Sequence, residues 1–352
     1  MTLVERRDVD HEDDDPVALP RPRGPLSEWL LDRLRRPVHA LGVPPGAVGD
    51  PISGEDRALA LYLCYELHYL GLPDVEEAWE WEPTLLAIRR DLETAFEAAL
   101  IDQVGHPPLG LSSAEVVVEL RRLANDDGPS LSQRVERDGD LDQLRQLAVH
   151  RSAYQLKEAD PHTWGIPRIS GAAKAGMVHL QHDEYGGGDP GAVHAQLFSK
   201  VLAALGLDHR YGALLDRVPA LSLSACNLIS LFGLHRRWRG ALAGHLALFE
   251  MTSVEPMGRY QRTLERLGFG PEATRFYAAH VEADEHHQVA AIDDLVRPLL
   301  EAEPILGGEV VFGARALHHL ESQLTAQILS AWDDGRSSLR DQVVSLSPPS
   351  SD

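Results

Sequence analysis

The stretch PEATRFYAAHVEADEHHQVAAIDDLVRPLL, from Pro271 to Leu300, places polar groups on a helix face that is expected to be buried. A helix turns by about 100° per residue. With His280 as the origin, Asp284 lies about 40° to one side and His287 about 20° to the other, so the three form one stripe. Apolar side chains share this side, and most of the other acidic residues of the stretch lie opposite. The pattern predicts a helix whose core face carries two histidines and a carboxylate.

Burying such groups costs several kcal/mol unless they are paired or bound to a cation. A metal ion would remove this cost, and imidazole together with carboxylate suits Fe(II), Mn(II) or Zn(II). A buried His-Asp-His hydrogen-bond network without metal is the alternative for this helix alone. His286 lies on a different face and is expected at the surface or behind a ligand.

A second carboxylate is expected in the core at Glu250. Three apolar residues precede it directly and Met251 follows, in a long apolar segment predicted as one helix over residues 221–251. Pairing with an arginine or with a helix start is the alternative role for Glu250. His245 is five residues away and belongs to another face of a straight helix, so we favour Glu250 as the ligand.

A third pair of candidates flanks a run of three glycines. Glu184 ends one predicted helix, and His194 lies in the first turns of the next. On one straight helix, residues ten apart are about 15 Å distant. The glycines at 186–188 must therefore bend the chain if the two side chains are to meet, which glycine permits. An ordinary helix corner with surface Glu and His is the alternative.

The rest of the chain is also predicted to be helical. Apolar residues recur at helical spacing, and no internal repeat or Gly-rich phosphate loop is present. The remaining predicted helices cover residues 26–34, 55–69, 83–100, 114–124, 141–158, 170–184, 190–205, 256–267 and 311–332.

Composition narrows the class of protein. Of 352 residues, 43% are hydrophobic, which is typical of a globular protein, and the net charge of −21 argues against a general nucleic-acid binder. The two cysteines, Cys64 and Cys226, lie far apart in apolar stretches and predict neither a disulfide framework nor a zinc site. The acidic start of the chain does not resemble a signal peptide, and no apolar run is long enough to span a membrane. We therefore expect a cytoplasmic protein.

These residues resemble the haem-oxygenase-like di-iron oxidases and oxygenases. That family has a Glu and a His on one core helix, a Glu on a second, and His-x-x-x-Asp-x-x-His on a third. Glu184 and His194 match the first element and Glu250 the second. His280, Asp284 and His287 match the third element without a gap.

The wide spacing between Glu184 and His194 is similar to the N-oxygenating branch of the family. That branch has an extra carboxylate on the preceding helix, and Glu158 stands at the expected place. A surface position at the end of its helix is the alternative for Glu158. The resemblance covers residues 150–300. The His-Asp-His triplet together with the upstream Glu is more specific for the family than any one of these motifs alone.

The resemblance implies an all-α fold, a haem-oxygenase-like seven-helix bundle without haem. It implies that two Fe(II) ions bind O2 as a bridging peroxide, which then leads to oxidation of a small amine, amino-acid or fatty-acid-like substrate. A homodimer is expected, with an electron donor that the sequence does not identify. Side chains expected to orient ligands are Asp183, Tyr185, Tyr277 and His286, and Arg168 or Lys174 are candidates for binding a substrate carboxylate.

Four regions are predicted. Residues 1–45 form an acidic, Pro-rich disordered tail with one short helix, 46–148 an N-terminal helical region, 149–335 the di-iron domain, and 336–352 a flexible tail. Three acids among the ligands argue against a haem oxygenase proper, and the absence of Glu-x-x-His motifs argues against a ferritin-like protein. Neither cysteine fits a thiaminase-like nucleophile. A metal-free helical binding protein of the same fold is the remaining alternative.

Overall fold

The computed structural model describes residues 17–46 and 48–340, and within this part the chain is helical and has no strand. This confirms the predicted all-α class. The helices are α1 Pro25–Leu34, α2 Glu55–Glu66, α3 Pro83–Val104, α4 Ser113–Ala124, α5 Leu131–Asp138, α6 Leu141–Gln155, α7 Asp160–Thr163, α8 Gly171–Glu184, α9 His194–Ala204, α10 Ala220–Leu234, α11 Arg239–Arg266, α12 Pro271–Ala290, α13 Arg297–Ala302 and α14 Gly307–Asp333. None of the helices in this part is long and apolar enough to cross a bilayer.

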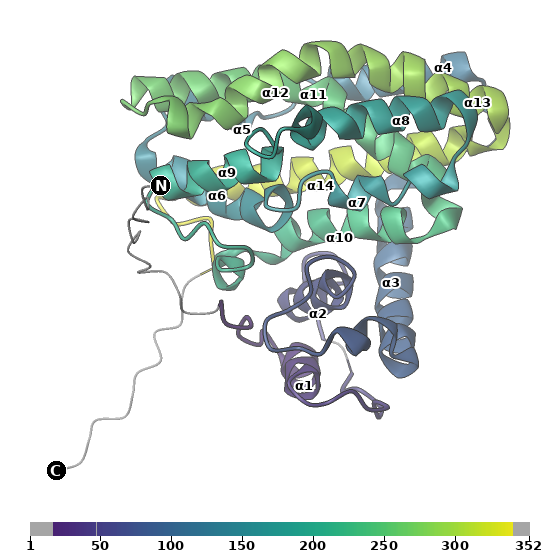
Figure 1. The fold of residues 1–352 in the computed structure, drawn as a ribbon, viewed down its shortest axis with the longest axis vertical. Coiled ribbons are helices and arrows are strands. Elements are labelled where there is room, and N and C mark those ends of the chain that lie inside the picture. The colour runs from purple at the N-terminus through teal and green to yellow at the C-terminus, as the bar shows by residue number, and fades with distance from the viewer. Residues whose placement is uncertain (1–16, 47, 341–352) are drawn as a thin grey trace, which may run out of the picture.

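Helix α11 is the centre of the bundle. It packs against α12 on one side and α14 on the other, and α8 and α9 complete the layer that surrounds α12. Helix α10 runs along the lower edge of this bundle in Figure 1 and separates it from α1 and α2. The elements predicted to carry metal ligands therefore all belong to the upper part of the molecule.

The N-terminal segment contributes to the core. Four leucines of α1, including Leu30 and Leu31, are buried against α2. Both carboxylate oxygens of Asp56 accept hydrogen bonds from α1, from the backbone N–H of Leu26 at 2.9 Å and of Ser27 at 2.7 Å. Asp56 thus satisfies two of the N–H groups that a helix start leaves without partners. Residues 1–16 and 341–352, the outer parts of the two predicted tails, lie outside the described residues, and the domain boundaries stay a prediction.

The prediction of a single helix over residues 221–251 is wrong. Helix α10 ends at Leu234, His235 has extended backbone, and α11 begins at Arg239. The polar residues at the break turn toward acids of α3: His235 Nε2 lies 3.0 Å from Glu93, and Arg237 pairs with Glu97. These charges cannot stay on a buried helix, which explains the break.

Helix α11 instead continues through Pro256, where the sequence predicted a new helix. A proline inside a helix removes one backbone donor and usually bends the helix. Just before it, the hydroxyls of Thr252 and Ser253 donate to the carbonyls of Leu248 and Phe249 one turn earlier, at 2.8 and 2.6 Å. Such bonds also tend to bend helices, so α11 has two features close to Glu250 that favour a bend.

The helix predicted from 271 to 300 is interrupted as well. After α12, residues Ala291–Val296 form a π-helix, and α13 follows with Pro298 in its first turn. The carbonyl of Asp294 lies against Gly176 of α8, where an added Cβ would lie only 2.2 Å from that oxygen. Helix α8 can therefore approach the π-helix closely only because residue 176 is glycine. π-Helical turns are frequent beside functional sites. Helix α5 was not predicted from the sequence.

Candidate metal centre

Glu158 lies at an irregular corner between α6 and α7. The corner ends at Ala159, which is buried and has a φ of 74°, a conformation that costs a residue with a Cβ about 1–3 kcal/mol. The Glu158 side chain is buried, and its Oε1 lies 3.5 Å from Nε2 of His280. Its other oxygen, Oε2, is buried without a hydrogen-bond partner among the described residues. Glu158 is thus a core residue and not a surface residue at a helix end.

The three glycines bring Glu184 and His194 together. Glu184 is the last residue of α8 and His194 the first of α9, and Nδ1 of His194 lies 2.7 Å from Oε2 of Glu184. All three glycines have positive φ, and an added Cβ at Gly186 would lie 2.7 Å from the carbonyl carbon of Ala192. The bend that the sequence required is therefore present, and it depends on glycine.

Helices α11 and α12 supply the other side of the cluster. Nδ1 of His287 lies 3.3 Å from Oε2 of Glu250 and 3.8 Å from Oε1 of Glu184. The rings of His194 and His280 lie next to each other, with centroids 4.2 Å apart. The side chain of Asp284 lies outside the described part of the structure, so its predicted role stays a prediction.

The six described candidates form two groups that share one carboxylate. Glu158, Glu184, His194 and His280 offer ligand atoms within 4.8 Å of one another, and so do Glu184, Glu250 and His287. All six residues are buried. Glu184 belongs to both groups, so it would take part in holding an ion at either of them.

Hydrogen bonds outside the cluster orient two of the histidines. Nδ1 of His280 lies 2.9 Å from the carbonyl of Phe276, so this nitrogen donates and Nε2 carries the lone pair toward Glu158. His287 is held the other way round: Nε2 lies 3.1 Å from Oδ2 of Asp183, which leaves Nδ1 for Glu250 and Glu184. Partners of this kind fix the tautomer and direction of metal-binding imidazoles.

The donor set fits iron. Three buried carboxylates so close together need positive charge nearby, and mixed imidazole and carboxylate ligands suit Fe(II) and related ions. A carboxylate with one buried oxygen that has no hydrogen-bond partner, as in Glu158, is the feature a bound cation would satisfy. The chemistry of these residues therefore fits a metal centre better than a self-sufficient polar network.

His245 belongs to a different pair. Its Nδ1 lies 3.0 Å from Nε2 of His162, both rings are buried, and burial lowers the pKa of His245 to about 3. It lies outside both groups of candidate ligands. Single-sequence reasoning gave no sign of His162, which lies in a short polar segment.

The residues predicted to orient ligands or to bind a substrate carboxylate do not gather at one place. Asp183 contacts His287, as described, whereas the Tyr185 hydroxyl donates to Asp160 at 2.7 Å. Tyr277 is buried and packs against Tyr260, and His286 is exposed. Neither Arg168 nor Lys174 borders the small cavity beside the ligands.

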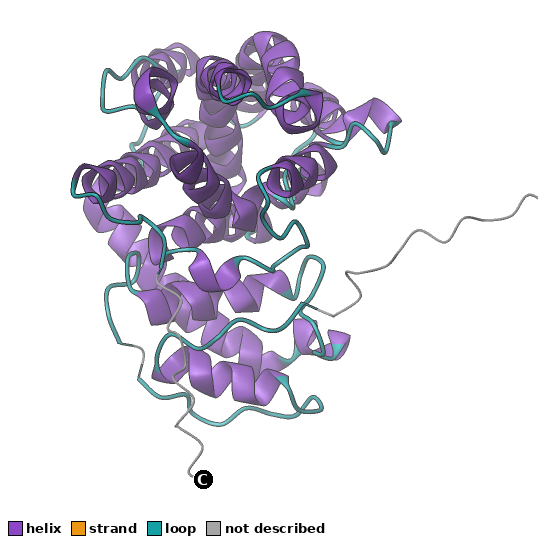
Figure 2. Ribbon diagram, turned by 90° about the vertical axis from the view of Figure 1, so that its left-hand side faces the viewer, coloured by secondary structure: helices purple, strands orange, loops and turns teal. Residues whose placement is uncertain are grey.

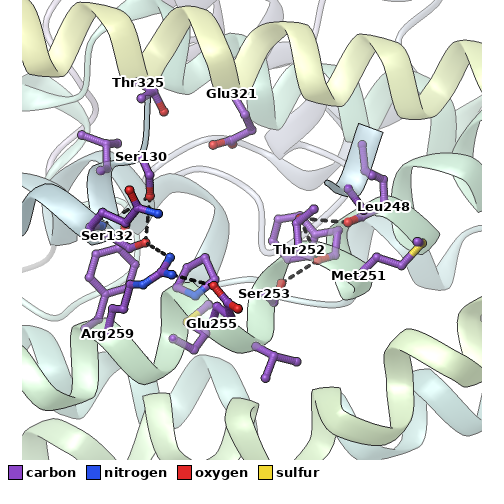
Figure 3. A pocket seen from close by; sticks show the side chains of 18 of the residues that line it. Ser130, Ser132, Leu248, Met251, Thr252, Ser253, Glu255, Arg259, Glu321 and Thr325 are labelled. Carbon is purple, nitrogen blue, oxygen red and sulfur yellow. Dashed lines mark hydrogen bonds and ion pairs between the residues drawn. The ribbon is translucent and has the colours of Figure 1, made fainter. Parts of the chain in front are cut away.

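Two cavities lie at or near the centre, and only the small one is lined by candidate ligands. A small one of about 10 Å³, room for roughly one water, touches Glu158, Glu184, Glu250 and His280. A much larger one, of about 1420 Å³, lies between α11 and α14 (Figure 3). Their linings share Tyr154, Phe249 and Ser253, three residues that sequence reasoning missed because nothing in their immediate neighbours distinguishes them from ordinary core positions.

Comparison with known proteins agrees with this centre. A family model described as "iron-containing redox enzyme" matches residues 145–322, just over half of the chain and the part that holds every candidate ligand. The chain belongs to this family. Its members are oxidoreductases that contain iron, which confirms the family predicted from the ligand motif.

A curated relative is the nitrosourea synthase of Streptomyces achromogenes subsp. streptozoticus. It is 27% identical over 150 residues, which are 42% of this chain and 31% of the relative. The chain thus matches about a third of the relative's length.

Proposed function

We propose that this member of the family is a non-haem di-iron enzyme that activates O2 and oxidises a small amine or amino-acid-like substrate. The observation that carries the proposal is the pair of ligand groups joined by Glu184. In this assignment Glu158, His194 and His280 would hold one ion. Glu250 and His287 would hold the other, with Asp284 as a further ligand.

Two Fe(II) ions would supply the electrons that reduce O2. The chain's own residues would bind and orient the ions and keep bulk water away from them. Carboxylates of the cluster lower its total charge, while Asp183 and the Phe276 carbonyl keep two imidazoles in the binding orientation. Burial keeps bulk water away, since the cavity beside the ligands has room for about one water molecule.

Tyr154 is placed to handle a proton. Its ring lines both cavities, and burial together with the carboxylates of Glu158, Glu184 and Glu250 holds the pKa of its hydroxyl well above the usual value. The phenol therefore stays protonated and can donate a hydrogen bond or a proton to a group that lies between the large cavity and the ligands.

The curated relative favours oxidation at nitrogen. A nitrosourea carries an N–N=O group, so an enzyme named for making one forms bonds to nitrogen. We propose the same class of reaction here, with decarboxylation or C–C cleavage as the alternatives in the family. A homodimer in the cytoplasm and an external electron donor are part of the proposal.

Anaerobic titration with Fe(II), followed by rapid mixing with O2, tests this function. Two equivalents of iron and a transient visible absorption band are expected, and both should be lost in His280→Ala and Asp284→Ala. His182→Ala is the control, because His182 lies beside the ligands on α8 but is exposed. No iron uptake, or equal uptake in all variants, would instead support a metal-free helical binding protein.

A further inference from the structure

The candidate ligands are shielded from solvent. All six described candidates have side chains that are 8% exposed or less. The cavity beside them has room for about one water molecule, so a cation cannot arrive there with its hydration shell. A charge that loses water without gaining a partner is very unfavourable. A metal ion therefore needs protein ligands at the place where it leaves the solvent.

The side of the cluster toward the large cavity offers a metal ion little. The linings of the two cavities share Tyr154 and Phe249, whose rings pack edge to face with centroids 5.6 Å apart. Ser253 is also shared, and its hydroxyl already donates to the carbonyl of Phe249. Ions such as Fe(II) bind through oxygen, nitrogen and sulfur, so this largely aromatic boundary is a poor entrance.

Helix α8 instead provides a polar contact between solvent and the cluster. Oδ2 of Asp183 lies 3.1 Å from Nε2 of His287. The Asp183 side chain is 39% exposed, so this one carboxylate meets both the solvent and a candidate ligand. Asp183 also directly precedes Glu184, which belongs to both groups of ligands. A cation held by Asp183 at the surface is thus already next to the cluster.

His179 adds a nitrogen at the same place. It lies four residues before Asp183 on α8, and residues at this spacing are neighbours on a helix. Nε2 of His179 lies 4.0 Å from Oδ2 of Asp183, and its side chain is 67% exposed. An imidazole beside a carboxylate is a ligand combination that suits Fe(II). The surface pair therefore has the same chemistry as the buried cluster.

The packing of α8 sets the distance from this pair to the cluster. Gly176 lies against Asp294, and seven residues further along α8 Asp183 contacts His287, seven residues before Asp294. The two segments therefore run antiparallel, side by side in the upper part of the bundle (Figure 1). His179 lies about one helical turn from the level of His287. An ion at the surface pair has only about this distance to travel.

We infer that His179 and Asp183 form an entry site for the metal ion. A hydrated Fe(II) ion first exchanges water for these two side chains, and its oxidation state does not change. It then exchanges them for Glu184, Glu250 and His287 in the core. The destination of the ion rests on the proposed function, and the entry site adds the path by which the ion arrives.

Stopped-flow mixing of the full metal-free chain with Co(II) tests the entry site, because the visible spectrum of Co(II) reports its ligands. His179→Ala should slow uptake about tenfold, the lower end of what local focusing adds to an association rate. Release to a chelator should slow by the same factor, since the ion leaves by the same path. The dissociation constant should therefore stay unchanged, whereas a residue that only supported the fold would alter it.

Two further variants complete the test. His179→Glu replaces the imidazole with a carboxylate, which also binds metal ions, and should restore at least the natural rate. His182→Ala is the matched control, because it removes another exposed histidine from α8. Nε2 of His182 lies 3.9 Å from the position of an added Cβ at Gly187, so this ring faces the glycine bend. Its loss should change neither the rate nor the dissociation constant.

The entry site is overturned if His179→Ala takes up Co(II) at the natural rate, if His182→Ala slows uptake equally, or if His179→Glu remains as slow as His179→Ala. Failure of the proposed function gives a different result. If the natural chain binds no Co(II) at equilibrium, both the metal centre and the entry site are wrong. Normal equilibrium binding with an unchanged rate in His179→Ala removes the entry site alone.

Discussion

Lys157 and Glu66 form an ion pair in the core, although 91 residues separate them in the chain. The Lys157 ammonium also lies 4.6 Å from the ring centroid of Tyr62 and 4.4 Å from that of Tyr69. The pair joins α2 to the corner that presents Glu158, the residue next to Lys157. The N-terminal helical region thus reaches the corner beside the candidate ligands through a buried ion pair.

Breaking this pair from one side should be costly. Lys157→Met leaves the Glu66 carboxylate buried without its cation, so we expect the free energy of unfolding to fall by about 3–5 kcal/mol. Lys157→Met/Glu66→Leu removes both charges and should recover much of the loss. Urea unfolding measures both variants, and equal losses in the two would show that the ion pair does not link α2 to the corner as described.

Ala159 offers a change that should stabilise the protein. Its φ of 74° suits glycine, so Ala159→Gly should raise the free energy of unfolding by about 1 kcal/mol. Ala153→Gly is the matched control, because Ala153 is equally buried but lies inside α6, where glycine costs about 1 kcal/mol. If thermal unfolding moves in the same direction for both variants, the corner is not strained.

The sequence predicts part of the candidate cluster because helical spacing is local. His280 and His287 share a face through the 3.6-residue repeat alone. Glu184 and His194 can meet only if the chain bends between them. The three glycines between the two residues make that bend possible. The sequence predicts that Asp183 orients a ligand, but only the structure identifies His287, 104 residues away, as its partner.

The errors arise from tertiary packing. The segment from 221 to 251 is largely apolar, and its length favours the prediction of one helix. In the structure, the polar residues near 236 instead contact Glu93 and Glu97 of α3, and the helix breaks there. Pro256 normally marks a helix boundary, but the surrounding bundle keeps α11 intact. The large cavity between α11 and α14 could not be predicted either, since its lining comes from seven helices, α4, α5, α6, α9, α11, α12 and α14, that no local pattern relates.

Gly186 should be essential for bringing the ligands together. Gly186→Ala combines a positive φ with an added Cβ only 2.7 Å from the Ala192 backbone, so a destabilisation of about 1–3 kcal/mol is expected. Because the bend sets the position of His194, Fe(II) affinity should also fall. Gly42→Ala, at an exposed loop glycine that has open space around it and no positive φ, should change neither property in calorimetry and iron titration.

Asp183 should control the metal-binding tautomer of His287. Asp183→Asn can no longer accept the Nε2–H bond as a carboxylate, and loss of such a partner typically weakens metal binding by about 10–100-fold. Asp189→Asn, an exposed acid close by, is the control. Titration with Co(II), whose visible spectrum reports its ligands, measures the effect; equal affinities in the two variants would exclude Asp183 as the orienting group.

His150 should make stability depend on pH. It is buried between the hydroxyls of Ser222 and Ser338, at 2.8 and 3.0 Å, and burial lowers its pKa from 6.5 to about 3. The unfolded chain therefore binds a proton that the folded chain does not between these values. Its contribution to stability is fully present above pH 6.5 and is lost as the pH falls toward 3.

At pH 5 this loss should reach about 2 kcal/mol, because the imidazole is protonated in the unfolded chain while it stays neutral in the folded chain. Urea unfolding between pH 7.5 and 5 measures the slope in the natural chain and in His150→Asn, which keeps a hydrogen-bonding side chain but does not titrate. His162 and His245 are buried with lowered pKa values in both proteins, so the difference in slope isolates His150. Identical slopes would mean that His150 already takes up its proton in the folded state.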